Sequence, residues 1–404
     1  RQIGKTYILK EFGKEYYPDF VYCNFEENSE LHNLFEINLD VHRIIEELSL
    51  YFEKKISEDM LIIFDEIQSC PRALTSLKYF CENLRNYHVV AAGSLLGVKL
   101  ARASSFPVGK VNFFNMYPMT FLEFLIAMDK KGLSELLQKK NDYTPLSEPF
   151  HSELLSLYKK YLFIGGMPEV VFNHIQTRDY QKTRILQLQI LKAYEEDFSK
   201  HTTKTDAIKI SQVWQSVPLQ LAREQKKFKY ADIKKGGRAK EFEQAIHWLK
   251  ETGLVHLCFR LKQPGLPIKA YSERSHFKLY ALDTGLLGAM LNLSEKTIVE
   301  GHKLFNHFHG AFIENFVAQE LKAYRDDDLF YWTSESIAEV DFILSCDDHI
   351  YPLEVKAGLS NRKKSLFVYD GKYQPQKLIT MTQKNYYSDG KFVNIPLYSG
   401  HYIL

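Results

Sequence analysis

The sequence predicts an α/β protein of several domains, and three observations point to this fold class. The chain starts on Gly4-Lys5-Thr6, and some sixty residues later an apolar run ends in Asp65-Glu66. The third observation is a pair of strand-like segments in the C-terminal third that carry charged residues at regular spacing. Because ligands bind outside the carboxyl ends of parallel strands, the first two features predict a sheet with a ligand site at one edge.

Gly4, Lys5 and Thr6 match the second half of a phosphate-binding loop. In G-x-x-x-x-G-K-[ST] the glycine lets backbone N–H groups surround the phosphates, lysine reaches the β and γ oxygens, and the hydroxyl binds Mg²⁺. A lone Gly-Lys-Thr also occurs in ordinary turns and helix starts. The first glycine and the strand before the loop would precede Arg1, so we expect residues 1–404 alone to bind nucleotide poorly.

Met60 to Phe64 is typical of a strand buried on both faces, as in the centre of a parallel sheet. Asp65 follows at its carboxyl end, where it could hold Mg²⁺ beside Thr6. Glu66 could polarise the attacking water as a general base. The alternative is a solvated strand end.

Two further segments, 20–25 and 87–94, are predicted strands of the same sheet. The second ends at Ser94, which lies where a residue that senses the γ-phosphate would be. A turn or a helix cap is the alternative for Ser94.

Composition limits the class of protein. With 404 residues, 45% of them apolar and 25% charged, the chain can form two to four globular domains. The net charge of +2 requires any nucleic-acid-binding surface to be local. Five scattered cysteines without a C-x-x-C pair predict reduced thiols, and no apolar run reaches the ~20 residues of a membrane span. We therefore expect a cytoplasmic protein without a membrane partner.

The pattern along the chain predicts four parts: 1–130, 145–222, 223–290 and 300–404. Residues 129–147 are polar and indicate a boundary or an insertion. From 149 to 222 the pattern is helical, with a break at 165–168, Gly-Gly-Met-Pro.

The segment 229–255 has the pattern of a helix-turn-helix, and two strand-like segments, 254–261 and 278–282, could add a wing. A winged helix places its second helix in the DNA major groove. A dense basic cluster surrounds this helix: Lys226, Lys227, Lys229, Lys234, Lys235, Arg238 and Lys240. Such a cluster suits salt-dependent phosphate binding, and domain packing with a solvated charged face is the alternative.

The C-terminal third holds a D-x(12)-E-x-K pattern made by Asp341, Glu354 and Lys356. It suits metal-assisted phosphodiester hydrolysis, with the two carboxylates on Mg²⁺ and the lysine beside the water or phosphate. Glu314, at the edge of a predicted buried helix, could be a second metal ligand or orient the water. A salt-bridge cluster is the alternative. The basic run 362–364 favours a phosphate nearby, whereas His302, His307 and His309 suggest an exposed loop rather than a metal site.

The whole chain resembles the prokaryotic AAA-type ATPases that carry a C-terminal domain of unknown function, DUF4143. The matching segments, in order along the chain, are 1–6, 63–68, 93–94, 117–124, 165–169, 279–286 and 354–356. The resemblance implies a P-loop NTPase core, a helical and winged-helix middle, and a C-terminal α/β domain similar to the PD-(D/E)XK nucleases.

Carried over by position, the resemblance places nucleotide binding on Gly4, Lys5 and Thr6, and nuclease-type residues on Glu314, Asp341, Glu354 and Lys356. The chain departs from the family at Gly109-Lys110, where relatives often have Gly-Arg. Lysine lacks the bidentate guanidinium fork, so a phosphate-reading arginine in cis is in doubt.

These observations predict an ATP-binding and ATP-hydrolysing protein, with ATP and Mg²⁺ as cofactors, that couples nucleotide state to a DNA-facing C-terminal module. One alternative is an ATP-regulated, Mg²⁺-dependent DNA nuclease, which the complete Glu, Asp, Glu, Lys set favours. Another is a nucleotide-dependent switch or DNA-binding regulator with a non-catalytic nuclease-like scaffold, which the near-neutral charge favours. The sequence does not indicate an oligomeric state.

Overall fold

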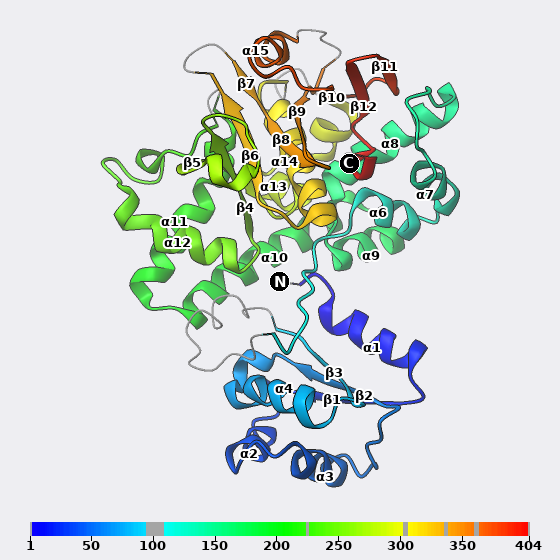
Figure 1. The fold of residues 1–404 in the computed structure, drawn as a ribbon, viewed down its shortest axis with the longest axis vertical. Helices are drawn as coiled ribbons and strands as arrows, with labels where there is room; N and C mark the ends of the chain where they lie inside the picture. Colours follow the sequence, from blue (N-terminus) through cyan, green and yellow to red (C-terminus); the bar gives the residue numbers. More distant parts are fainter. Residues whose placement is uncertain are drawn as a thin grey trace. The chain divides into compact units, whose positions relative to one another are not determined.

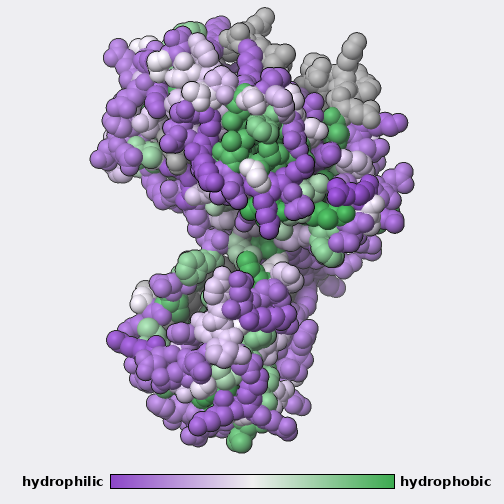
Figure 2. Space-filling model, turned by 90° about the vertical axis from the view of Figure 1, so that its right-hand side faces the viewer, coloured by the Kyte–Doolittle hydropathy of each residue, from purple (hydrophilic) through white to green (hydrophobic). Residues whose placement is uncertain are grey.

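The computed structural model describes residues 2–93, 109–223, 226–301, 306–334, 338–358 and 363–402. The chain forms two compact units, residues 1–116 and 117–404 (Figure 1). Charged and polar residues dominate the face in Figure 2, and each unit also shows apolar areas there. In the part of the chain described, no helix is both long and apolar enough to cross a membrane.

The first unit is built on a parallel sheet of three strands in the order β1-β2-β3. These strands are β1 (Phe20–Asn24), β2 (Leu61–Asp65) and β3 (His88–Ala91). Every residue of β2 is buried, because β2 lies between the other two strands and is covered on both faces. The register pairs Asn24 with Asp65, so polar side chains gather at the carboxyl ends of the strands.

Helices cover both faces of this sheet (Figure 1). α2 (Glu30–Glu36), α3 (Val41–Tyr51) and α4 (Pro71–Asn83) pack on the face that carries Val21, Cys23, Ile62 and Phe64. α1 (Lys5–Tyr16) lies on the other face. There Gly13 permits close approach, because a Cβ at this position would lie 2.9 Å from the Phe20 ring.

The second unit begins with helices, as the sequence predicts for 149–222. They are α6 (Phe121–Ala127), α7 (Lys131–Gln138), α8 (Glu148–Ile164), α9 (Pro168–Thr177), α10 (Tyr180–His201) and α11 (Lys204–Leu221). Gly165 ends α8 with φ +78°, and Pro168 starts α9, which explains the predicted break. The polar stretch 129–147 is not wholly irregular, because α7 lies within it.

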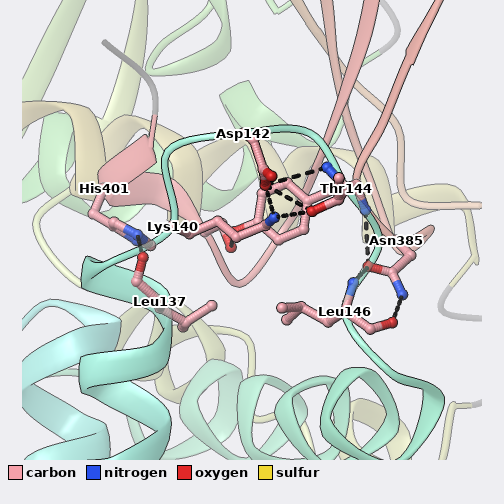
Figure 3. A network of polar contacts seen from close by, with 9 residues as sticks. Leu137, Lys140, Asp142, Thr144, Leu146, Asn385 and His401 are labelled. Carbon is pink, nitrogen blue, oxygen red and sulfur yellow. Dashed lines mark hydrogen bonds and ion pairs between the residues drawn. The ribbon is translucent and has the colours of Figure 1, made fainter.

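The segment after α7 is fixed to the C-terminal end of the chain (Figure 3). The Asn385 side-chain amide donates to Leu146 O at 2.8 Å, and its oxygen accepts from Leu146 N–H at 3.0 Å. His401 Nε2 lies 3.0 Å from Leu137 O. Residues 137–146 are therefore part of the packed second unit.

Three of the segments that carry the family resemblance meet in this unit. Gly166 N–H donates to Asp283 Oδ2 at 2.6 Å, and Gly166 O accepts from Met119 N–H at 2.7 Å. A Cβ at Gly166 would clash with Met119 O, and one at Gly165 would clash with the Asp283 carboxylate. These glycines are required because three backbone segments approach each other closely.

Two sheets complete the second unit, the first in the order β5-β4-β6-β7. Its strands are β4 (Val255–Leu261), β5 (Ser272–Ala281), β6 (Leu329–Thr333) and β7 (Glu339–Val340). α12 (Ala239–Glu251) precedes the β4–β5 hairpin, α13 (Thr284–Met290) follows it, and α14 (Asn306–Arg325) leads to β6. The predicted wing strands thus exist, but β4 also pairs in parallel with β6 and belongs to a larger sheet.

The second of these sheets has the order β11-β12-β10-β9-β8. Its strands are β8 (Phe342–Cys346), β9 (His349–Val355), β10 (Leu378–Thr382), β11 (Tyr387–Asp389) and β12 (Phe392–Pro396). α15 (Lys364–Tyr373) connects β9 to β10, which run parallel. Glu354, one residue before the end of β9, lies beside Thr380 in the middle of β10.

Candidate functional site

The first candidate site lies at the N-terminus of α1. Gly4 precedes this helix with φ +81°, a conformation that glycine adopts without strain, and Lys5 is the first helical residue. The N–H groups of a helix N-terminus and the helix dipole attract anions. Gly4, Lys5 and Thr6 therefore occupy the position at which a phosphate-binding loop passes into its helix.

Thr6 and Asp65 meet at this point, although 59 positions separate them in the sequence. The Thr6 hydroxyl donates to Asp65 Oδ2 at 2.6 Å, and the Tyr22 hydroxyl donates to the same oxygen at 2.9 Å. A hydroxyl and a carboxylate supply the hard oxygen ligands that Mg²⁺ prefers. The residues present therefore fit a magnesium ion.

Glu66 follows Asp65 in a left-handed conformation, with φ +47°, which is uncommon for a residue with a side chain. Its N–H donates to Asp65 Oδ1 at 2.9 Å, and the Gln68 side-chain amide donates to its carboxylate. Two hydrogen bonds to Ala92, which follows β3, hold this turn. Ala92 N–H donates to Phe64 O at 2.8 Å, and Ile67 N–H donates to Ala92 O at 3.0 Å. The left-handed backbone thus places the Glu66 N–H on the Asp65 carboxylate, while the Glu66 carboxylate accepts from Gln68.

Two further residues bear on this site. Ser94, the predicted phosphate sensor, lies outside the described residues. Tyr22 was not expected from the sequence, although it alternates with the core-facing residues of β1 and therefore shares the face of Asn24. Burial and the hydrogen bond to Asp65 raise the pKa of Tyr22, so its hydroxyl remains a donor at neutral pH.

The second candidate site is a buried cluster in the second unit that contains Glu314 and Asp341. Glu314 comes from α14, and Asp341 lies between β7 and β8. The fully buried Lys278 of β5 lies between them, with Nζ 3.9 Å from Glu314 Oε2 and 3.9 Å from Asp341 Oδ1. Lys278 also pairs with Glu339, and Lys226 pairs with Glu314. Two lysines thus compensate three carboxylates.

The protonation of this cluster follows from burial and from the ion pairs. Burial and the charge of Glu314 raise the pKa of Asp341 to about 7. Burial alone would raise the pKa of Glu314, but Lys226 and Lys278 hold it below its usual range. Tyr280 and the surrounding carboxylates raise the pKa of Lys278 despite its burial. Lys278 is therefore charged at neutral pH.

Glu354 and Lys356 form a separate ion pair on the neighbouring strand, with Lys356 Nζ 2.6 Å from Glu354 Oε1. The Glu354–Lys356 pair comes close to the cluster around Lys278 at one point, where Val355 N–H donates to Asp341 Oδ2 at 2.8 Å. The described residues include no group of three or more His, Cys, Asp or Glu side chains that could hold a metal ion. The ammonium of Lys278 lies where a Mg²⁺ shared by Glu314 and Asp341 would bind, so these two carboxylates do not fit that ion as a pair.

Lys278 and Lys226 were missed as members of this cluster by the reasoning from sequence. A signal for Lys278 was present, because a lysine inside the apolar segment 277–282 must be paired if that strand is buried. Lys226 was assigned to the basic cluster near α12. In the structure it is half-buried against Glu314, whereas Lys227, Lys229, Lys235, Arg238 and Lys240 are exposed.

The first unit thus combines a parallel sheet, with Asp65-Glu66 at the carboxyl end of its middle strand, and a Gly4-Lys5-Thr6 loop at the start of α1, which is the class of site that binds nucleotide phosphates. Residues 1–125 match the family model of an AAA domain. Residues 155–297 match DUF8612 and residues 309–399 match DUF4143, both domains of unknown function. This order confirms the resemblance seen in the sequence and adds a middle domain that the sequence reasoning did not name.

Among solved structures, a Walker-type ATPase of Pyrococcus abyssi is similar to this chain, with 12% sequence identity and a TM-score of 0.44. The match covers 72% of this chain and 89% of that one. No protein with a curated description matches the chain significantly.

Proposed function

We propose that the protein binds and hydrolyses ATP through Gly4, Lys5, Thr6, Asp65 and Glu66, and that nucleotide state controls the part of the chain after residue 116. The hydrogen bond of 2.6 Å between Thr6 and Asp65 is the observation that carries this proposal. It joins the two halves of a nucleotide site, and the AAA domain over 1–125 supports the same assignment.

In the proposed site, the N-terminal N–H groups of α1 and Lys5 bind the phosphates, while Thr6 and Asp65 would hold Mg²⁺. The metal would neutralise charge on the phosphates when bound. Tyr22 keeps Asp65 in place through its hydroxyl. Glu66 accepts a proton from the attacking water, in a turn whose backbone N–H is bonded to Asp65 and whose carboxylate is held by Gln68.

Replacement of Glu66 tests this assignment in the full-length protein. We expect Glu66→Gln to reduce ATP turnover about 10²-fold or more, the usual contribution of a general base, while nucleotide binding is retained. Glu58→Gln, an exposed acidic residue of the same unit, is the control. Unchanged turnover in Glu66→Gln would remove Glu66 as the base.

For the C-terminal cluster, we propose the scaffold alternative over the nuclease. The ammonium of Lys278 between Glu314 and Asp341 favours it, because this charge repels a metal ion from the same place. We expect no Mg²⁺-dependent DNA cleavage by the wild type. Cleavage that disappears in both Asp341→Ala and Glu354→Gln would instead establish the nuclease.

We propose that the basic surface around α12 faces DNA. Its support is the exposure of Lys235 and Arg238, whereas Lys234 pairs with Glu241 at 3.0 Å. Reversing the charges of Lys234, Lys235 and Arg238 should weaken duplex DNA binding and flatten its dependence on salt. If the affinity for duplex DNA does not change, the segment serves in domain packing and not in DNA binding.

A further inference from the structure

A hollow of about 660 Å³ lies on the β11-β12-β10-β9-β8 sheet of the second unit, over the end of β9 and over residues of β10 and β12. A volume of this size suits a ligand as large as a nucleotide. Hydrogen bonds within the protein fix the side chains at the bottom of the hollow without a ligand. The Thr380 and Thr382 hydroxyls donate to Asn394 Oδ1 at 3.1 and 2.9 Å, and the Asn394 amide donates to backbone oxygens.

The charges that line the hollow are predominantly positive. Lys356, Lys363 and Lys384 reach it from three different segments, and Glu354 is the acidic residue among the lining side chains. Lys363 Nζ lies 4.0 Å from the centre of the Phe392 ring, which holds it at the rim. Three ammonium groups against one carboxylate make an anion the favoured occupant.

Glu354 supplies a second and independent observation. The residue is only 2% exposed, and its Oε2 has no hydrogen-bond partner although Oε1 is paired with Lys356. A buried carboxylate oxygen without a partner is costly, so a donor from outside would be stabilising here. A hydroxyl or an amino group of a ligand would serve.

Two exposed aromatic side chains complete the wall. Phe367 of α15 is 57% exposed and packs edge-on against Phe392, and Tyr387 of β11 is 53% exposed. An aromatic face beside a cationic groove is the combination that binds nucleotides by base stacking together with phosphate attraction.

We propose that this hollow binds a nucleotide unit without a metal ion. The three lysines attract its phosphate, Phe367 or Tyr387 stacks on its base, and the Glu354 carboxylate, which lines the hollow, accepts a hydrogen bond from its sugar or base. This site is separate from the ATP site of the first unit and from the exposed lysines near α12. Its occupant is either a free mononucleotide or one nucleotide of a single strand. The test below distinguishes the two by comparing the affinity for a mononucleotide with the affinity for an oligonucleotide.

The test uses the full-length protein with Lys5→Ala, which weakens phosphate binding at the first site. Two probes are titrated in the presence of EDTA. Binding of fluorescein-labelled hexathymidylate is followed by anisotropy, and binding of thymidine 5′-monophosphate is followed by calorimetry. Saturable binding is expected. Comparable affinities would identify a free nucleotide as the occupant, and binding of the hexamer alone would identify a strand.

Variants then locate the binding. Lys363→Ala and Phe367→Ala should each weaken it about tenfold, which corresponds to ~1.4 kcal/mol and lies within the range for one stacked base. Lys372→Ala, an exposed lysine at the other end of α15, is the matched control and should leave affinity unchanged. The charge-reversed α12 variant should also bind the hexamer normally.

Three results would overturn the proposal: no binding of either probe in EDTA, binding that requires added Mg²⁺, or equal effects of Lys363→Ala and Lys372→Ala. None of these results bears on ATP turnover. Failure of this proposal is therefore distinguishable from failure of the proposed ATPase.

Discussion

At the scale of residues, ion pairs between buried side chains stabilise the second unit. Lys278 is fully buried, and its ammonium lies near Glu314, Glu339 and Asp341 and 4.8 Å from the centre of the Tyr331 ring. Such a cluster costs desolvation energy, which the ion pairs offset. Removal of one partner leaves the others buried and uncompensated.

We predict that Lys278→Met destabilises the protein by about 3–5 kcal/mol, the usual cost of breaking a buried ion pair by removing one partner. Urea unfolding, followed by tryptophan fluorescence, measures the change, since all three tryptophans lie after residue 116. Lys269→Met is the control, because its pair with Asp327 is exposed and contributes ~0–1 kcal/mol. Equal effects of the two changes would contradict a structural role for the cluster.

Buried carboxyls also make stability depend on pH. Glu320 accepts a hydrogen bond of 2.9 Å from Phe121 N–H, and burial raises its pKa to about 8. Because the folded state holds this proton more tightly than the unfolded state, its stabilisation is full below about pH 4.5 and is lost as the pH rises to 8. Asp283, with a pKa raised to about 6, acts in the same direction.

We therefore expect the Tm of the wild type to fall between pH 5 and pH 8.5 and that of Glu320→Gln to fall less. Glutamine keeps an oxygen for the Phe121 N–H and cannot ionise. Thermal unfolding across this range, followed by circular dichroism, makes the comparison. Parallel curves for the two proteins would show that Glu320 does not titrate in this window.

At the scale of elements, glycines decide where helices end and how closely segments approach. The Gly165-Gly166 break was predicted from sequence, but its reason is tertiary. Asp283 caps α13 by accepting from Leu286 N–H at 2.9 Å, and it accepts from Gly166 N–H as well. Nothing in residues 165–168 indicates a partner more than a hundred positions away.

Gly166→Ala should destabilise the second unit by about 2 kcal/mol or more, because the new Cβ would clash with Met119 O. Gly132→Ala in α7 is the matched control. No atom lies within 4 Å of its added Cβ, so the change should stabilise the helix by ~1 kcal/mol. Differential scanning calorimetry gives both shifts, and similar shifts in one direction would refute the close packing at Gly166.

At the scale of the whole molecule, the boundary between the compact units does not lie where the polarity of the sequence suggests it. The polar segment 129–147 suggested a domain boundary or an insertion, yet Leu146 near its end is bonded to Asn385, and Leu137 in its middle lies against His401 (Figure 3). The boundary between the compact units falls instead at residues 116 and 117.

The packing of residues 137–146 predicts what happens when the chain is cut at a protease site inserted into this segment. With a protease site inserted after Asp142, the two fragments should stay together in size-exclusion chromatography, because residues 137–146 are packed against 385–401. With the site inserted after Met116, the fragment from residue 117 onward should keep its helical circular dichroism, because it forms a compact unit by itself. Separation of the fragments after cleavage at Asp142 would contradict the packed arrangement.

Local patterns determined the strands, the helices and the nucleotide motifs of this protein. The buried run 61–64 with Asp65-Glu66 after it predicted β2 and its ligand edge, because periodicity and burial are properties of neighbouring residues. The same reasoning selected Thr6, and the structure places its hydroxyl on Asp65.

Only the tertiary structure decided what the buried carboxylates face. Spacing alone left Asp341, Glu354 and Lys356 open to both a metal site and an ion-pair cluster, with Glu314 as a possible further metal ligand. The fold inserts Lys278 from β5 between Glu314 and Asp341, and leaves one oxygen of Glu354 without a partner beside a cationic hollow. Charge interactions depend on distance in space, which sequence spacing does not fix across separate strands.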